Sequence, residues 1–83
     1  MIPYQKVESL AACRMTPQQI ADALDIDLDE LKQDRECLGK FYKYIRKGRA
    51  KGEAELRAAL FKRARKGDAF ALRELLKVDK NQD

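Results

Sequence analysis

Apolar residues recur three and four positions apart along almost the whole chain, and no stretch alternates apolar and polar residues for more than a few positions. A spacing of three and four places apolar side chains on one face of an α-helix, whereas a half-buried strand needs a period of two. We therefore expect an all-α protein. Its predicted parts are an N-terminal three-helix unit, a basic helical segment and a short C-terminal helix.

The length of 83 residues fits one compact domain, because a chain this short closes only a small core. It excludes a multidomain enzyme. Charged residues make up 39% of the chain and interrupt every apolar run before the roughly 18 residues that a membrane span needs. The first residues also lack the apolar stretch and cleavage site of a secretory signal. We expect an intracellular, cytoplasmic protein that does not bind a membrane.

Two short turns are predicted to separate the first three helices. Thr16 is suited to cap a helix that starts at Pro17, and Gln19 stands at the position of its capping-box partner. Asp27 is suited to cap a third helix, which we expect to run to Leu38.

The segment from Pro17 to Glu36 has the pattern of a helix-turn-helix unit, in which two helices cross steeply over a short turn. Ala21 is the small residue at the crossing. Apolar residues fill the angle between the helices: Ile20, Leu24, Ile26 and Leu31. Asp25 takes the turn position often held by glycine and tolerates the left-handed conformation. The same pattern also fits a three-helix bundle with a tight turn and no relation to DNA.

Two glycines lie inside the basic segment. Gly48 and Gly52 each cost about 1 kcal/mol in a helix interior relative to alanine. We expect the helix to break or kink between them, the alternative being that another helix approaches them closely. Gly67 is expected to end the segment. A last helix is then predicted from its apolar residues, Phe70, Leu72, Leu75, Leu76 and Val78.

These boundaries divide the chain into a helix-turn-helix unit, 1–39, a basic helical hairpin, 40–79, and a frayed tail, 80–83. The formal net charge of +4 is divided unevenly between them. Residues 1–39 contain four basic and eight acidic side chains, a net charge of −4, whereas residues 40–83 contain fourteen basic and six acidic, a net charge of +8. Because potentials add locally, an anionic partner is expected to meet the second half.

Candidate DNA contacts come from two places. Side chains of the predicted third helix are able to contact base edges: Lys32, Gln33 and Arg35. A basic run with no acid between its members is suited to phosphates: Lys40, Lys43, Arg46, Lys47, Arg49 and Lys51. Tyr42 and Tyr44 interleave with this run and are candidates to stack on a base. Such a run is also typical of the solvated face of an amphipathic helix.

No catalytic or metal site is predicted. The chain has no histidine, which excludes Ser-His and Cys-His catalysis and mixed Cys/His zinc sites. Cys13 and Cys37 form no CxxC pair and are expected to be reduced, apolar core residues, the alternative being a structural disulfide. The chain also lacks a glycine-rich phosphate loop. We expect a non-enzymatic protein without a cofactor.

The order of these elements resembles the small DNA-packaging (terminase) subunits of tailed bacteriophages and their short helix-turn-helix relatives. The resemblance is carried by Leu10–Ile26, Gly48–Lys51 and Leu60–Asp68. It implies recognition of viral double-stranded DNA by a helix Asp27–Leu38 and oligomerisation through helices within Phe41–Leu76. It also implies delivery of the DNA to a large ATPase/nuclease subunit in the bacterial host cell.

Two functional hypotheses follow. In the first, the chain is a phage DNA-binding protein of small-terminase type that recognises viral DNA for packaging. In the second, it is a phage-encoded inhibitor or adaptor whose acidic half binds a basic partner. We expect a homo-oligomer, because a stripe of small residues, Gly48, Gly52 and Ala59, accompanies a core that is thin for a monomer.

Overall fold

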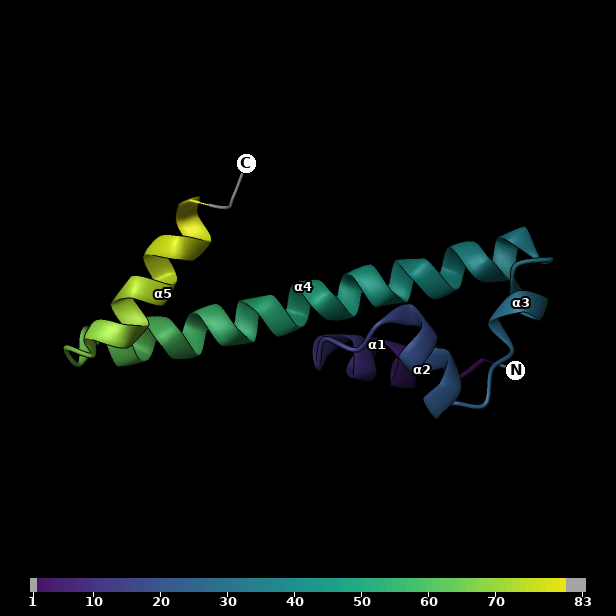
Figure 1. Cartoon of the computed structure of the whole chain (residues 1–83), viewed down its shortest axis with the longest axis horizontal. Helices are drawn as coiled ribbons and strands as arrows, with labels where there is room; N and C mark the ends of the chain where they lie inside the picture. The colour runs from purple at the N-terminus through teal and green to yellow at the C-terminus, as the bar shows by residue number, and fades with distance from the viewer. Residues whose placement is uncertain (1, 81–83) are drawn as a thin grey trace. The chain divides into compact units, whose positions relative to one another are not determined.

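The computed structural model describes residues 2–80, and every regular element in this range is an α-helix (Figure 1). The helices are α1 (Tyr4–Ala12), α2 (Pro17–Ala23), α3 (Leu28–Leu31), α4 (Arg35–Arg65) and α5 (Ala69–Lys80). The predicted all-α class is therefore confirmed. Contacts group the chain into two compact units, which we call unit 1 (Met1–Gly52) and unit 2 (Glu53–Asp83). α4 contributes to both units.

In the chain, unit 1 ends at Gly52 and unit 2 begins at Glu53. The first half of α4 belongs with α1, α2 and α3, which lie along it (Figure 1). Lys80 is the last residue of α5, and the rest of the expected frayed tail, 81–83, lies outside the described residues. Within residues 2–80, no helix combines the length and the apolar composition needed to cross a bilayer.

The two predicted N-terminal caps form. The Thr16 side chain accepts a hydrogen bond from the Gln19 backbone N–H at 3.1 Å, and the Gln19 side chain accepts one from the Thr16 N–H at 2.9 Å, which completes the capping box. Asp27 caps α3 by accepting hydrogen bonds from the N–H groups of Asp29 and Glu30 at 3.1 and 3.2 Å. These bonds satisfy donors that the first turn of a helix leaves unpaired.

The turn between α2 and α3 depends on Asp25. Its φ of 55° lies in the left-handed region, which aspartate tolerates better than most residues. The N–H of Ile26 then donates to the carbonyl oxygen of Ala21 at 2.8 Å and closes the end of α2. Ile20 and Ala21 are fully buried at this corner.

The predicted third helix, Asp27–Leu38, is wrong. α3 is a single turn, Leu28–Leu31, and a new helix starts at Arg35. The break occurs at Asp34, whose carboxylate accepts a hydrogen bond from the Cys37 N–H at 3.2 Å and so caps α4.

α4 is one unbroken helix, so the predicted break or kink between Gly48 and Gly52 is wrong. α1 packs here so closely that a Cβ atom at either glycine would collide with its backbone. At Gly48 the added atom would meet the carbonyl oxygen of Glu8 and, at 2.9 Å, the Cβ of Ala11. At Gly52 it would meet the carbonyl oxygen of Ala12. The two glycines therefore allow α1 to pack closely against α4 inside unit 1, and they do not form an exposed stripe.

The core of unit 1 draws on all four of its helices. Its buried residues are Val7, Ala11, Ile20, Ala21, Leu28, Leu31, Phe41 and Ile45. Phe41 and Ile45 stand one turn apart on α4, on the side that α1 covers, and are almost completely buried. Cys37 is half-buried against this core, whereas Cys13 is exposed, so the expected burial of both thiols is wrong for Cys13.

In unit 2, the predicted stop at Gly67 forms a Schellman motif. Gly67 has a φ of 89°, its N–H donates to the Ala64 carbonyl at 3.0 Å, and the Asp68 N–H donates to the Arg63 carbonyl at 3.3 Å. Asp68 also caps α5, accepting hydrogen bonds from its first backbone N–H groups at 3.0 and 3.2 Å. The Arg63 guanidinium lies 2.9 Å from the same carboxylate, so one turn joins α4 to α5 through several bonds.

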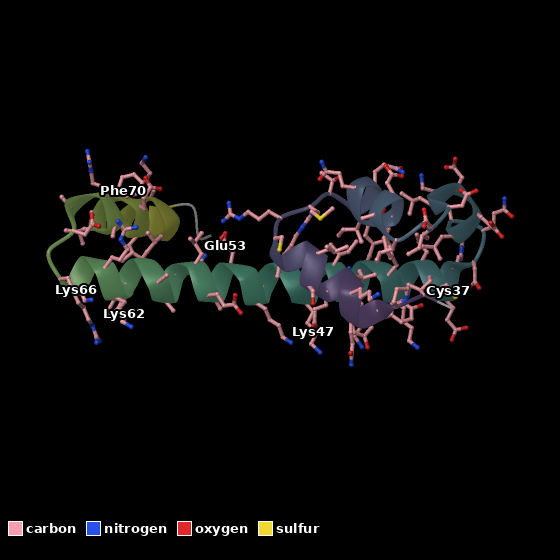
Figure 2. The ribbon with its side chains drawn as sticks, turned by 90° about the horizontal axis from the view of Figure 1, so that it is seen from below. Cys37, Lys47, Glu53, Lys62, Lys66 and Phe70 are labelled. Atoms are coloured by element: carbon pink, nitrogen blue, oxygen red, sulfur yellow. The ribbon has the colours of Figure 1, made fainter. Side chains whose placement is uncertain are left out.

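The apolar residues from which the last helix was predicted are mostly exposed within the described part of the chain. Ala71 is fully buried and Leu75 is half-buried, whereas Phe70 stands out from the surface of α5 (Figure 2). Five large apolar side chains of unit 2 are 40–54% exposed: Leu56, Phe61, Phe70, Leu72 and Leu76. The side chain of Val78 lies outside the described residues. A hairpin of two helices has a single internal interface, so apolar positions to the side of it stay uncovered.

Replacing Gly48 with alanine is expected to destabilise the protein. The new methyl group meets the α1 backbone, and overpacking of this kind costs about 1–3 kcal/mol. Gly39→Ala is the matched control, because Gly39 lies in the same helix, an added Cβ there meets no atom within 4 Å, and alanine gains about 1 kcal/mol of helix propensity. Denaturant unfolding followed by circular dichroism measures both. Equal stability of the two variants contradicts the close packing of α1 on α4.

Candidate nucleic-acid interface

Six basic side chains project from residues 40–51 of α4, and no acidic residue lies among them. All six are exposed: Lys40, Lys43, Arg46, Lys47, Arg49 and Lys51. Residues three and four apart share one face of a helix, so Lys43, Arg46 and Lys47 lie together, on the side away from the buried Phe41 and Ile45. We call these six residues the α4 basic face.

Glu8 of α1 is the counter-charge of the α4 basic face. Its carboxylate lies 3.1 Å from Nζ of Lys51 and 3.5 Å from Nζ of Lys47, which extends from α4 beside α1 (Figure 2). The hydrogen bond from Lys51, with the charges of both lysines, holds the pKa of Glu8 below its ordinary value. The Lys47 and Lys51 side chains remain 55% and 57% exposed, so both are accessible to a second anion.

The other four residues of the α4 basic face differ in the contacts that their side chains make. The Arg49 guanidinium donates to the carbonyl oxygen of Met15 at 3.3 Å. Nζ of Lys40 lies 5.4 Å from the ring centre of Tyr4, a cation–π distance. Within the described part of the chain, no ion pair or hydrogen bond engages Lys43 or Arg46. These two cations have their full charge available to an external partner.

The two tyrosines expected to stack on bases are both half-buried. Tyr44 stacks on Tyr4 of α1 with ring centres 5.1 Å apart, and Tyr42 meets the edge of the Phe41 ring at 5.7 Å. Burial raises the pKa of Tyr4, and the neighbouring Cys37 adds to that shift. The Tyr44 ring therefore belongs to the contact between α1 and α4 and is not presented to a base.

The predicted base readers do not share one helix. Lys32 and Gln33 lie in the turn after α3, and Arg35 is the first residue of α4. All three are exposed, and Nζ of Lys32 lies 3.9 Å from the carboxylate of Asp29. The helix expected to enter a DNA groove is a single turn with Asp29 and Glu30 at its start. Lys32 and Gln33 come before α4 in the sequence, and Arg35 is its first residue, so all three precede the α4 basic face in the chain.

Sequence reasoning missed a groove of about 420 Å³ in unit 1. Its apolar lining includes Ile2, Leu24, Ile26 and Leu31, and its acidic lining is Asp25, Asp27, Glu30 and Asp34. We call it the acidic groove. The sequence indicates this groove only by a run of acidic residues with apolar residues between them. The groove is also lined by the N-terminal segment, which comes next to the turns on either side of α3 only when the chain folds.

One carboxylate of the acidic groove, that of Asp34, has a lowered pKa. Hydrogen bonds from the thiol and the backbone N–H of Cys37 hold the pKa of Asp34 below its ordinary value. The same hydrogen bond to Asp34 raises the pKa of the Cys37 thiol, which therefore stays protonated. Among residues 2–80, no group of three or more histidine, cysteine, aspartate or glutamate side chains is placed to hold a metal ion.

The lowered pKa of Glu8 makes the contact between α1 and α4 sensitive to acid. Ionised Glu8 is favoured by the folded chain, so its contribution to stability is present above the ordinary value of 4.5 and is lost as the pH falls through the lowered value. We expect Glu8→Gln to melt below the wild type at neutral pH and to converge with it at acid pH. Asp22→Asn, which removes an exposed acid of α2, is the control. A melting difference for Glu8→Gln that is the same at every pH contradicts this role.

Comparisons with known proteins leave the function to be inferred from the residues. The chain matches no protein-family model, no curated protein and no solved structure. The α4 basic face and the acidic groove are the two surfaces from which a function can be argued.

Proposed function

We propose that this protein is a non-enzymatic bacteriophage DNA-binding protein of small-terminase type, which binds viral double-stranded DNA for packaging through the α4 basic face. The observation that carries the proposal is the exposed, acid-free set of six cations along one half-helix. Contacts between cations and phosphates supply most of the sequence-independent affinity for DNA, and they need only such a surface. Lys43 and Arg46 are its centre, because neither is neutralised within the described residues.

In this proposal α2 and α3 form a helix-turn-helix unit that supports α4. The buried Ala21 at the corner and the left-handed Asp25 in the turn support that assignment. The second helix of the motif is one turn long and has Asp27 as its cap, followed by Asp29 and Glu30. Negative charge at this end opposes entry into a groove flanked by phosphates, so we assign the DNA contact to α4.

Sequence preference is expected to be weak. Lys32, Gln33 and Arg35 stand next to the N-terminal end of α4 and are the candidate base contacts. Delivery of the DNA to a large ATPase/nuclease subunit, and a place in the host cytoplasm, are proposals that follow from the resemblance alone.

Titration of duplex DNA at several salt concentrations tests the proposal. Each phosphate that a cation neutralises contributes about −0.9 to the slope of log affinity against log salt. We expect the double variant Lys43→Gln, Arg46→Gln to bind more weakly and to flatten this slope by about 0.9 for each cation removed. The double variant Lys6→Gln, Lys77→Gln removes the same charge outside the face and should keep the wild-type slope. Absence of wild-type binding even at about 50 mM salt overturns the proposal.

Removing the counter-charge is expected to strengthen DNA binding. Glu8→Gln releases Lys47 and Lys51 from their shared carboxylate, so affinity should rise and the salt slope should steepen by up to about 0.9 for each lysine. Asp22→Asn adds the same net charge on α2, where the carboxylate accepts a hydrogen bond from Gln18, and should change affinity less. Equal effects of the two variants mean that net charge, and not the α4 basic face, controls binding.

A further inference from the structure

Unit 2 presents an aromatic ring between two cations on one stripe of α4. The side chain of Phe61 is 52% exposed. Arg57 and Arg65 stand four residues before and after it, so each lies about one helical turn from the ring on the same side of α4. The Arg65 guanidinium lies over the ring, 4.7 Å from its centre, which is a cation–π distance. The three side chains therefore form a line of cation, ring and cation.

A depression of about 510 Å³ adjoins this line of side chains. α5 contributes Leu75 to it, and α4 contributes a third cation, Lys62, which extends from the surface of unit 2 (Figure 2). None of the residues that line the depression is acidic. We call them the Phe61 site: Arg57, Ala58, Phe61, Lys62, Arg65 and Leu75.

The charges of the Phe61 site are largely unopposed. Arg57 reaches the Glu53 carboxylate only at 4.0 Å, the limit of an ion pair. Within the described residues, Lys62 and Arg65 form no ion pair. The site therefore attracts an anionic ligand, and its exposed ring offers that ligand an apolar contact.

We propose that the Phe61 site binds single-stranded DNA, with an unpaired base stacked on the Phe61 ring and the flanking phosphates held by the three cations. A nucleotide strand alternates flat bases with phosphates, and the stripe on α4 alternates a ring with cations in the same way. In a duplex each base is paired and stacked on its neighbours, and taking one out costs free energy. The site therefore prefers a single strand, and it accepts any base because every base has a π-face.

An acidic, apolar protein segment is the other class of partner that charge alone allows. The geometry favours a nucleic acid, because the guanidinium of Arg65 lies over the Phe61 ring and both kinds of plane accept a stacked base. The choice of DNA also rests on the proposed function, in which the same chain binds duplex DNA through the α4 basic face. No residue of the Phe61 site belongs to that face, so the two contacts can fail separately.

Tryptophan fluorescence tests the inference, because the chain has no tryptophan of its own. Phe61→Trp places a single reporter in the site and keeps a ring on which a base can stack. We expect a homopolymeric thymine strand to quench this fluorescence saturably, and a duplex of the same length to quench it much less. Phe70→Trp is the matched control, because Phe70 is 54% exposed on α5 and lies outside the site. Its fluorescence should respond little to either DNA.

A second pair of variants measures affinity with the ring removed. In the Lys43→Gln, Arg46→Gln background, which weakens the α4 basic face, we expect Phe61→Leu to bind a labelled thymine strand about 5- to 150-fold more weakly, the effect of losing one stacked base. Phe70→Leu in the same background should bind like its parent. Adding Lys62→Gln to the Phe61→Trp chain should flatten the salt dependence of quenching by about 0.7, the value for one phosphate of a single strand. Circular dichroism confirms that each variant folds.

Phe61→Trp fluorescence that does not change with the thymine strand overturns the inference. Equal quenching by strand and duplex also overturns it, because the contact is then electrostatic and involves no stacked base. A response to a synthetic peptide of leucine and glutamate, with none to the strand, assigns the site to an acidic protein partner. Quenching by the strand in a chain that binds no duplex counts against the proposed function alone and leaves this inference in place.

Discussion

The seating of α1 on Gly48 and Gly52 is the constraint on which unit 1 depends. With no side chain at these two positions, the α1 backbone lies against α4, and Val7 and Ala11 reach the same core as Phe41 and Ile45. The other buried residues of this core come from α2 and α3: Ile20, Ala21, Leu28 and Leu31. The continuity of α4 follows from the same contact, because packing against α1 offsets the low helix propensity of glycine.

The same contact organises the charge of unit 1. Lys47 and Lys51 stand on either side of Gly48, so the approach of α1 brings Glu8 between them. The lysine side chains of these ion pairs are more than half exposed, so the pairs contribute little stability by themselves. Their larger effect is on the surface, where one carboxylate partly neutralises two of six cations and leaves Lys43 and Arg46 as the strongest positive charges of the face.

Local signals in the sequence predicted the structure well, whereas signals that depend on distant partners did not. The Thr16 capping box and the Gly67 stop are decided within a few residues, and both form. An aspartate at position 34 suits either the exposed surface of a helix or a helix N-cap. It is a cap because α4 starts at the next residue, Arg35. Gly48 could either break its helix or allow a second helix to pack closely against it. Which of the two occurs depends on the α1 backbone at Glu8, forty positions earlier in the chain. The residues of the α4 basic face were predicted from the sequence. Its counter-charge Glu8 and the acidic groove were not, because they form only when α1 and the N-terminal segment pack in the fold.

Folding also redistributes the charge that the sequence segregates. The six cations of the α4 basic face join the acidic first 39 residues in one compact unit, which then holds ten basic and eight acidic side chains. The unit is nearly balanced, so its partners are selected by local fields and not by its net charge. Cations gather on α4 and carboxylates gather around the turns on either side of α3. In our proposal a polyanion binds the α4 basic face, and the four carboxylates of the acidic groove stand on other elements of the same unit.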